Sequence, residues 1–198
     1  MEKLIHEIKE LLLAPAKLFE RLKQEETSQS EITKTILVYV AAIPAIAGFI
    51  GLVVIGSSGP YYGLYTHSRV SIFSGLIWAV VLFVLTIIGV YLVSFIVSGL
   101  APKFGGIKNE LNAFKLTVYS FVPLLVLGAF SMIPALSGLF ILGLYGIYLF
   151  YIGAPILIEI PEEKVLTFTV IVSLISIMIT ILFYSIAGKV IVTQVPNL

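Results

Sequence analysis

Apolar residues along the chain gather into long runs that short polar stretches separate. Five such runs cover about residues 36–55, 72–100, 113–130, 137–158 and 165–187. A run of about twenty apolar residues is the length that an α-helix needs to cross the hydrocarbon core of a bilayer. The pattern therefore predicts an all-α, polytopic membrane protein in which residues 35–198 form one bundle of five transmembrane helices.

Residues 1–23 have a different pattern, in which apolar and charged positions alternate at helical spacing. This spacing predicts an amphipathic helix, and Pro15 suits the first turn of a second short helix. The helices could lie on the membrane surface or pack against the cytoplasmic end of the bundle. We expect Lys3, Glu7, Lys9 and Glu10 on their polar face. Their apolar stripe consists of Leu4, Ile8, Leu11, Leu12, Leu18, Phe19 and Leu22.

Two connecting segments differ in polarity. Residues 24–34 form a polar linker that leads into the first span, and Ser28 followed by Glu31 fits a capping box at the start of a helix. Residues 131–136, between the third and fourth spans, carry no charge. This turn either lies at the membrane interface or enters a part of the membrane that protein covers, because lipid-exposed irregular backbone is not tolerated.

Composition agrees with a membrane location, and the charges predict an orientation. The chain has 198 residues, of which 59% are hydrophobic and 12% are charged, whereas soluble domains are about 45–50% apolar and about 25% charged. With five spans, ten of the twelve Lys and Arg residues lie on the side of the N-terminus. Because cytoplasmic loops carry an excess of Lys and Arg, we expect a cytoplasmic N-terminus and an external C-terminus.

Residues that support catalysis or ion coupling are scarce. The chain has no cysteine and two histidines, and it contains no phosphate loop or nucleophile motif. No ionisable residue lies in the middle of a span, where such residues usually mark ion paths. We expect Lys115 and Glu159, near the inner boundary, to reach water. The sequence thus predicts a non-enzymatic protein without metal, cofactor or nucleic-acid partner, and it disfavours a proton-coupled pump.

The fourth span combines glycines with tyrosines. On a helix with about 100° per residue, the glycines fall within an arc of about 80° and the tyrosines within about 120° on the opposite side. Small residues let membrane helices approach closely, so the glycine face predicts a contact between helices. The tyrosine hydroxyls either bond to neighbouring spans or line a polar groove for a lipid headgroup or small ligand. The candidate groove consists of Tyr119, Ser120, Tyr145, Tyr148 and Tyr151, and the glycines are Gly143, Gly146 and Gly153.

Four of the nine prolines bear on the shape of the predicted spans. Pro44, Pro123 and Pro155 fall inside spans, and Pro134 falls in the turn before the fourth span. A proline inside a membrane helix frees a carbonyl that neighbours must satisfy, and it can bend the helix. These prolines predict either fixed kinks or hinges for a conformational change.

Several stretches of the chain resemble a known family. The segment "LNAFKLTVYSFVPLL" carries Tyr-Ser-x-x-Pro at residues 119–123. The later segment "MIPALSGLFILGLYGIYLFYIGAPILIEIPEEKVLTFT" carries Leu-Tyr-Gly-x-Tyr-Leu at 144–149 and Gly-x-Pro at 153–155. With "AAIPAIAGFIG" and "LLLAPAKLFERL", they resemble the YIP family of Rab-interacting-type membrane proteins, in its prokaryotic branch. The resemblance covers nearly the whole chain and implies five spans and a cytoplasmic N-terminus in the plasma membrane of a prokaryote.

The resemblance also implies a class of function. Eukaryotic relatives bind prenylated Rab GTPases and serve vesicle traffic and membrane shape, but the chain lacks their Asp-Leu-Tyr-Gly-Pro signature, so we do not expect a Rab partner. The leading interpretation is a scaffold or membrane-organising factor that contacts membrane lipids. A further protein partner and an oligomer stay open. The alternatives are a small transporter or channel, whose pathway the tyrosines would line beside the proline kinks, and an intramembrane enzyme.

Overall fold

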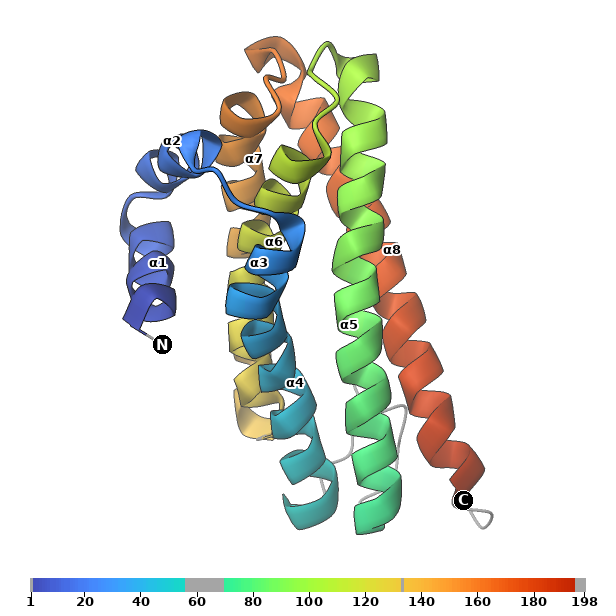
Figure 1. Ribbon diagram of the computed structural model, residues 1–198. Coiled ribbons are helices and arrows are strands. Elements are labelled where there is room, and N and C mark those ends of the chain that lie inside the picture. Colours follow the sequence, from blue (N-terminus) through green and yellow to red (C-terminus); the bar gives the residue numbers. More distant parts are fainter. Residues whose placement is uncertain (1, 56–69, 133, 195–198) are drawn as a thin grey trace.

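The computed structural model describes residues 2–55, 70–132 and 134–194, which form helices and short connections without a strand (Figure 1). The α-helices are α1 (Glu2–Leu13), α2 (Pro15–Gln24), α3 (Gln29–Ile32), α4 (Val38–Ile50), α5 (Ile72–Leu100), α6 (Glu110–Leu127), α7 (Tyr145–Leu157) and α8 (Glu162–Gln194). Two π-helical turns, η1 (Thr33–Leu37) and η2 (Gly51–Ile55), flank α4. The 3-10 segments are η4 (Ala101–Phe104), η5 (Gly128–Met132) and η6 (Pro134–Leu144).

Four helical stretches are long and apolar enough to cross a membrane, and a fifth is shorter. The four are Gln29–Ile55, Ile72–Phe104, Glu110–Phe130 and Glu162–Lys189, and the shorter apolar helix is Ile141–Leu157. The predicted all-α membrane bundle is therefore confirmed. The fourth predicted span, residues 137–158, departs most from a regular α-helix, because its first part is the 3-10 segment η6.

The 3-10 geometry of η6 bears on whether this segment can cross the bilayer. A 3-10 helix rises about 2.0 Å per residue and an α-helix about 1.5 Å. The 11 residues of η6 and the 13 residues of α7 therefore extend over roughly 40 Å, which exceeds the hydrocarbon thickness of about 30 Å. The segment is long enough for a fifth span although its α-helical part is short.

Helix α6 lies at the centre of the bundle. Every residue from Asn112 to Ser120 is buried, whereas α5 and α8 present large apolar side chains on their outer faces, including Phe95, Leu174 and Met178. Exposed apolar faces of this size suit helices that have lipid on one side, because lipid tails are as apolar as the side chains. Helix α6 contacts α2, α3, α4, α5 and α7, whereas α8 packs against α5 and α7.

The N-terminal helices pack against the bundle. Figure 1 shows α2 near the end where α7 and α8 join, and α1 running back alongside α6 and α7. Leu11, Leu18 and Phe19 are fully buried. The sequence allowed the amphipathic segment to lie on the membrane surface or to pack against the bundle. In the structure it packs against the bundle. After the linker, the Ser28 hydroxyl accepts a hydrogen bond from the Glu31 amide at 3.2 Å, as the capping box predicts.

Glycines allow α7 and the end of η6 to approach α6. A Cβ at Gly146 would overlap the carbonyl oxygen of Ser120. A Cβ at Gly143 would lie 2.7 Å from Leu124, and one at Gly153 would lie 2.6 Å from Leu116. All three positions face α6, so the predicted glycine face coincides with a helix contact in which a side chain would not fit.

Three of the four prolines lie inside α-helices. Pro44 is buried in α4, where a Cβ added at Gly128 would lie 2.7 Å from its side chain. Pro123 lies in α6 and Pro155 in α7, and Pro134 begins η6. Their role as fixed kinks or as hinges stays a prediction.

A Gly146→Ala substitution should lower the stability of the protein. The added methyl group meets backbone of α6, which cannot move aside as a side-chain tip can, and overpacking of this kind costs about 1–3 kcal/mol. Gly99→Ala is the matched control, because nothing lies within 4 Å of a Cβ at that helical position. The control should gain about 0.5–1 kcal/mol from helix propensity. Thermal unfolding in detergent measures both, and equal stability of the two variants would show that α6 and α7 are not closely packed.

Candidate functional site

The most polar buried region of the described structure is the contact between the N-terminal helices and the bundle. We call it the docking site. It consists of Glu7, Leu11, Leu18, Phe19, Leu22, Lys115, Tyr119 and Gly153, all of which are buried.

The apolar part of the docking site centres on Phe19. A Cβ at Gly153 of α7 would lie 3.0 Å from two atoms of the Phe19 ring. The glycine thus leaves the space into which the ring packs, beside Leu116 of α6. Burial of an aromatic side chain is worth about 1.5–3 kcal/mol when water is the alternative, so Phe19 is a main apolar anchor of α2.

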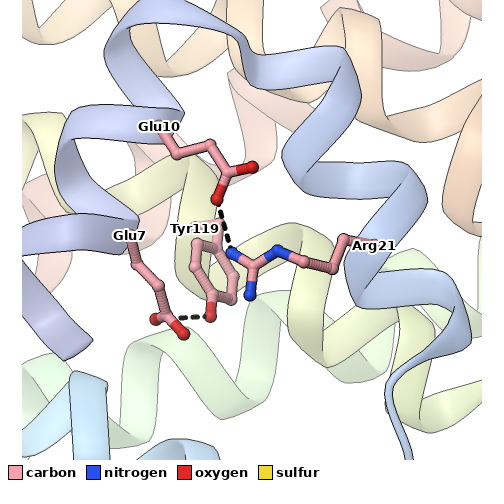
Figure 2. Close-up of polar contacts among 4 residues, drawn as sticks. All are labelled: Glu7, Glu10, Arg21 and Tyr119. Carbon is pink, nitrogen blue, oxygen red and sulfur yellow. Dashed lines mark hydrogen bonds and ion pairs between the residues drawn. The ribbon is translucent and has the colours of Figure 1, made fainter.

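The polar part of the docking site begins with a buried carboxylate. Tyr119 donates a hydrogen bond from its hydroxyl to Glu7 Oε2 at 2.9 Å (Figure 2). The Glu7 residue is 3% exposed and Tyr119 is 2% exposed. Hydrogen bonds to an ionised acceptor are shorter and stronger than neutral ones, and burial away from water strengthens them further. Glu7 therefore does not lie on a water-facing polar surface, which corrects the prediction from the amphipathic pattern.

An ion pair within the N-terminal segment lies beside this hydrogen bond. Arg21 of α2 contacts Glu10 of α1 at 2.6 Å, and their side chains are 41% and 24% exposed. Figure 2 shows the Arg21 side chain reaching from α2 toward the Glu10 carboxylate. The pair joins α1 to α2, and as a partly exposed ion pair it contributes about 0–1 kcal/mol.

Lys115 connects α6 to the end of α2. Its Nζ donates to the carbonyl of Leu22 at 2.5 Å and to the carbonyl of Glu25 at 2.8 Å, and the residue is 1% exposed. The last carbonyls of a helix lack partners within the helix, and a cation there also complements the helix dipole. Lys115 thus caps α2 in the protein interior. The expectation that it reaches water is wrong, because α2 covers it.

A third polar residue of α6 holds α7. Asn112 donates from its side-chain amide to the carbonyl of Leu157, the last residue of α7, at 3.0 Å. Asn112, Lys115 and Tyr119 are spaced i, i+3 and i+7, which places them along one side of α6. One stripe of three polar side chains therefore binds the ends of α7 and α2 and the middle of α1.

The rim of the docking site is solvated. Lys23 contacts Glu159 at 2.8 Å, and their side chains are 39% and 50% exposed. Glu159 therefore reaches the surface, as expected from its position near the inner boundary. Exposed pairs of this kind contribute about 0–1 kcal/mol and weaken with salt, so the buried contacts dominate the docking.

The five residues of the predicted polar groove do not share one surface. Tyr119 bonds to Glu7, and Tyr145 donates to the carbonyl of Leu12 at 3.3 Å. Tyr148 and Tyr151 are 51% and 44% exposed on α7. Ser120 instead lines a cavity beside α8. Two of the four tyrosines thus bond to α1, a partner that the sequence did not indicate.

Glu7 and Lys115 are the site residues that sequence reasoning missed. Glu7 lies four positions before the buried Leu11 on the same side of α1, but its burial depends on Tyr119 of α6. Lys115 belongs to the polar stripe of an otherwise apolar span. Among the residues that the structure describes, no group of three His, Cys, Asp or Glu side chains could hold a metal.

The fold and this site define a polytopic helical membrane protein, with a central polar-striped helix and amphipathic N-terminal helices docked against it. The chain belongs to the Yip1 family, because the family's model, described as the Yip1 domain, matches residues 9–184. The match includes α2 and most of the docking site. No curated protein and no solved structure matches the chain.

Tyr119→Phe should loosen the docked N-terminal helices. The substitution keeps the ring and removes the hydroxyl that donates to the buried Glu7 carboxylate, and a hydrogen bond to a charged group is worth about 1.5–3 kcal/mol. Hydrogen exchange of the reconstituted protein should show protection of the α1 and α2 amides reduced at least roughly tenfold, since 1.4 kcal/mol corresponds to tenfold.

Tyr148→Phe is the matched control, because that hydroxyl belongs to a half-exposed tyrosine on α7, and protection of α1 and α2 should not change. Wild-type protection should also persist at high salt, since salt screens buried contacts far less than exposed ones. If residues 7–24 of the wild type exchanged as fast as the linker that follows them, the N-terminal helices would not be docked.

Proposed function

We propose that the protein is a non-enzymatic membrane-organising factor of the Yip type, located in the plasma membrane of a prokaryote with its N-terminus in the cytoplasm. The observation that carries the proposal is the docking of α2 near one end of the bundle and of α1 alongside α6 and α7 (Figure 1). Buried polar contacts make these helices a fixed part of the membrane domain. They add helices to the end of the bundle at which α2 lies.

The outer face of the docked segment suits contact with lipid. Leu12 and Leu13, at the end of α1, are 52% and 84% exposed. The Leu12 carbonyl accepts a hydrogen bond from Tyr145 of α7, and the ring of the exposed Tyr148 lies beside that of Tyr145 in a tilted arrangement, with centroids 5.4 Å apart. Tyrosines combine an apolar ring with a polar tip and favour the membrane interface. Exposed leucines beside exposed tyrosines support an interfacial position for α1.

An added helix pair in one leaflet gives the protein a physical means to organise a membrane. Amphipathic helices that insert into the headgroup region sense and change curvature. The charge distribution supports a cytoplasmic N-terminal side, and in that orientation the docked helices would enlarge the cross-section of the protein in the cytoplasmic leaflet. We infer that this asymmetry directs the protein to membranes whose cytoplasmic leaflet is expanded.

The transporter alternative finds less support. Its pathway would need the four tyrosines and Ser120 to face one passage, whereas Tyr119 and Tyr145 bond to α1 and the exposed tyrosines face outward. The cavity beside α8 is lined by apolar residues, glycines and uncharged hydroxyl groups. Such a lining is better suited to holding an apolar molecule than to conducting a polar solute.

Labelling of single cysteines should establish the orientation and the number of spans. The chain contains no cysteine, so each introduced cysteine reports one position. Cysteines at Glu25, Ile107 and Glu162 should react only from the cytoplasmic side. Cysteines at Leu64 and at the C-terminus, both outside the described residues, should react only from the external side. Reaction of positions 107 and 162 from opposite sides would contradict five spans.

Sorting by curvature should test the membrane-organising role. The full-length protein is reconstituted into vesicles of mixed diameter and carries a fluorophore at Glu26→Cys. An external quencher then identifies the molecules whose α1 and α2 lie on the outer leaflet, because it reaches only their fluorophore. The density of the wild type should rise as vesicle diameter falls, because strongly curved outer leaflets have packing defects that apolar side chains fill. Leu12→Glu with Leu13→Glu should abolish this rise.

Ala16→Glu with Gln24→Glu is the control for added charge, since both are exposed positions of α2, and it should sort like the wild type. A wild-type density that does not depend on diameter would contradict the proposed function. The same conclusion would follow if the two double variants sorted equally.

A further inference from the structure

Charged residues begin at different heights on two sides of the bundle. We call the end of the bundle at which α2 lies the inner end and the opposite end the outer end. The hydroxyl groups of Thr33 and Tyr91 lie 2.6 Å apart, so the start of the first span is level with this point of α5. Lys34 follows Thr33 directly. Along α5, the next charged residue after Tyr91 is Lys103, 12 positions nearer the inner end. At a rise of about 1.5 Å per residue, the charges on the two sides begin about 18 Å apart in height.

The same two segments are level at the outer end. The Val70 amide, two residues before α5, donates to the carbonyl of Leu52 at 3.3 Å. The extra length of α5 therefore lies at the inner end, where Figure 1 shows α5 and the beginning of α8 extending past the level of α3. A tilt of the bundle does not remove this difference, because a tilt that brings the inner ends into register takes the outer ends out of it.

The extra length carries exposed apolar side chains. Phe95 of α5 is 72% exposed and Leu166 of α8 is 64% exposed. Leu166 lies near the height of the end of α5, because Phe168 packs against Phe104 of η4 with ring centroids 5.2 Å apart. The apolar surface thus reaches the inner end of both helices.

This surface continues the lipid-facing sides of α5 and α8 without interruption. Residues 70–102 and 165–188 contain no charged residue. Exposed apolar side chains recur along each helix every three or four positions, which places them on one face. They are Ile88, Leu92 and Phe95 on α5 and Leu166, Val170 and Leu174 on α8. The continuity of this face with the part inside the bilayer indicates that acyl chains cover it up to the inner end.

The side of the bundle that carries α1 and α3 is charged at lower heights. Lys9 of α1 and Lys34 of η1 are exposed. Glu7 bonds to Tyr119, which lies nine residues, or about 13 Å, farther from the inner end than Glu110 at the start of α6. Helix α1 therefore carries its exposed charge well below the inner end, at heights where α5 and α8 expose only apolar side chains on their outer faces.

We propose that the bilayer surface meets the inner end of the protein at two heights, closer to the membrane centre beside α1 and α3 than beside α5 and α8. A flat surface at the height of Lys103 would place the exposed charges of α1 and η1 in hydrocarbon, which is unfavourable. A flat surface at the height of Lys34 would leave Phe95 and Leu166 in water, which is also unfavourable. Bilayers adapt to spans of different length by local thinning or thickening, so phospholipid that is thinned on one side of the bundle satisfies both sides.

The step in the bilayer goes beyond the proposed sorting by curvature and does not depend on it. Sorting relies on the exposed leucines of α1, whereas the step follows from the heights of charged and apolar residues around the whole bundle. A protein that sorts equally into all vesicles can still thin the bilayer beside α1 and α3.

Reactivity of single cysteines tests the two heights. The full-length protein is placed in dioleoylphosphatidylcholine nanodiscs, and its reaction with a charged, water-soluble maleimide is timed and divided by the rate of the same variant unfolded in dodecyl sulfate. Thr35→Cys is an exposed position next to Lys34. It should react at least roughly tenfold faster than Phe95→Cys, because neither a charged reagent nor a thiolate is stable in hydrocarbon. Leu166→Cys should be as slow as Phe95→Cys.

This order of rates is the reverse of what a flat bilayer surface gives. Thr35 lies six residues, or about 9 Å, farther from the inner end than Phe95 when Thr33 and Tyr91 are aligned. A flat surface that protects Phe95→Cys must also protect Thr35→Cys. Equal rates at the two positions, or a faster reaction of Phe95→Cys, would overturn the proposal.

Two further cysteines are the matched controls, one for each side of the bundle. Ile107→Cys lies in the loop that follows η4 and should react fast, so that the water boundary beside α5 falls between positions 95 and 107. Ile46→Cys is 58% exposed on α4 and should be slow, so that the boundary beside α3 falls between positions 35 and 46. A fast reaction of Ile46→Cys would mean that water follows the whole of α4 and would also overturn the proposal.

A quenching experiment identifies what covers the extra length of α5 and α8. A fluorophore is attached at Phe95→Cys or Leu166→Cys before reconstitution into nanodiscs of phosphatidylcholine with brominated acyl chains, which quench only on contact. Both positions should lose fluorescence relative to unbrominated lipid, and a fluorophore at Lys17→Cys, an exposed position of α2, should not. Slow maleimide reaction at Phe95→Cys without quenching would mean that a second copy of the chain covers α5, and the proposal of a raised bilayer surface would be wrong.

Discussion

The buried ammonium of Lys115, held by two carbonyls at the end of α2, is the contact on which the arrangement of the N-terminal helices depends. Between membrane helices, apolar side chains provide little net driving force, because lipid offers them an equally apolar environment. Polar groups must instead find partners within the protein. Asn112 and Tyr119 meet the same requirement on the same side of α6. Three side chains of one helix thus help to fix the positions of α7, α2 and α1.

The side of α6 that carries Tyr119 and the side that carries Ser120 have different surroundings. On the face of Tyr119, polar groups are paired and buried, which holds segments that are distant in the sequence. Near Ser120, one residue later, glycines bring α7 close to α6 while α8 stays apart, so space remains beside an unpartnered hydroxyl. Adjacent residues of one helix therefore support a rigid contact and an open cavity, because they point about 100° apart.

The apolar runs predicted the long helices well, since membrane thickness imposes a length that any spanning helix must meet. Most of the site was beyond such reasoning. Every span is apolar, although the stretch that contains the central α6 is less so than those of the lipid-facing α5 and α8. The burial of Glu7 depends on Tyr119, a residue 112 positions away, and a local amphipathic pattern contains no such information. The spacing of Asn112, Lys115 and Tyr119 did indicate which side of α6 other segments would contact, because polar residues at i, i+3 and i+7 of an apolar span need partners on one side.

The 3-10 geometry of η6 means that the length of the fourth span depends on conformation as well as on residue number. Rewinding its 11 residues as an α-helix would shorten the segment by about 5.5 Å, because the rise falls from about 2.0 to about 1.5 Å per residue. A mismatch between a span and its bilayer costs fractions of a kcal/mol per Å. A bilayer thinner by that amount would thus favour the shorter form by roughly 1–3 kcal/mol. For a segment that spans the bilayer, membrane thickness would thus bias the choice between the two helical forms.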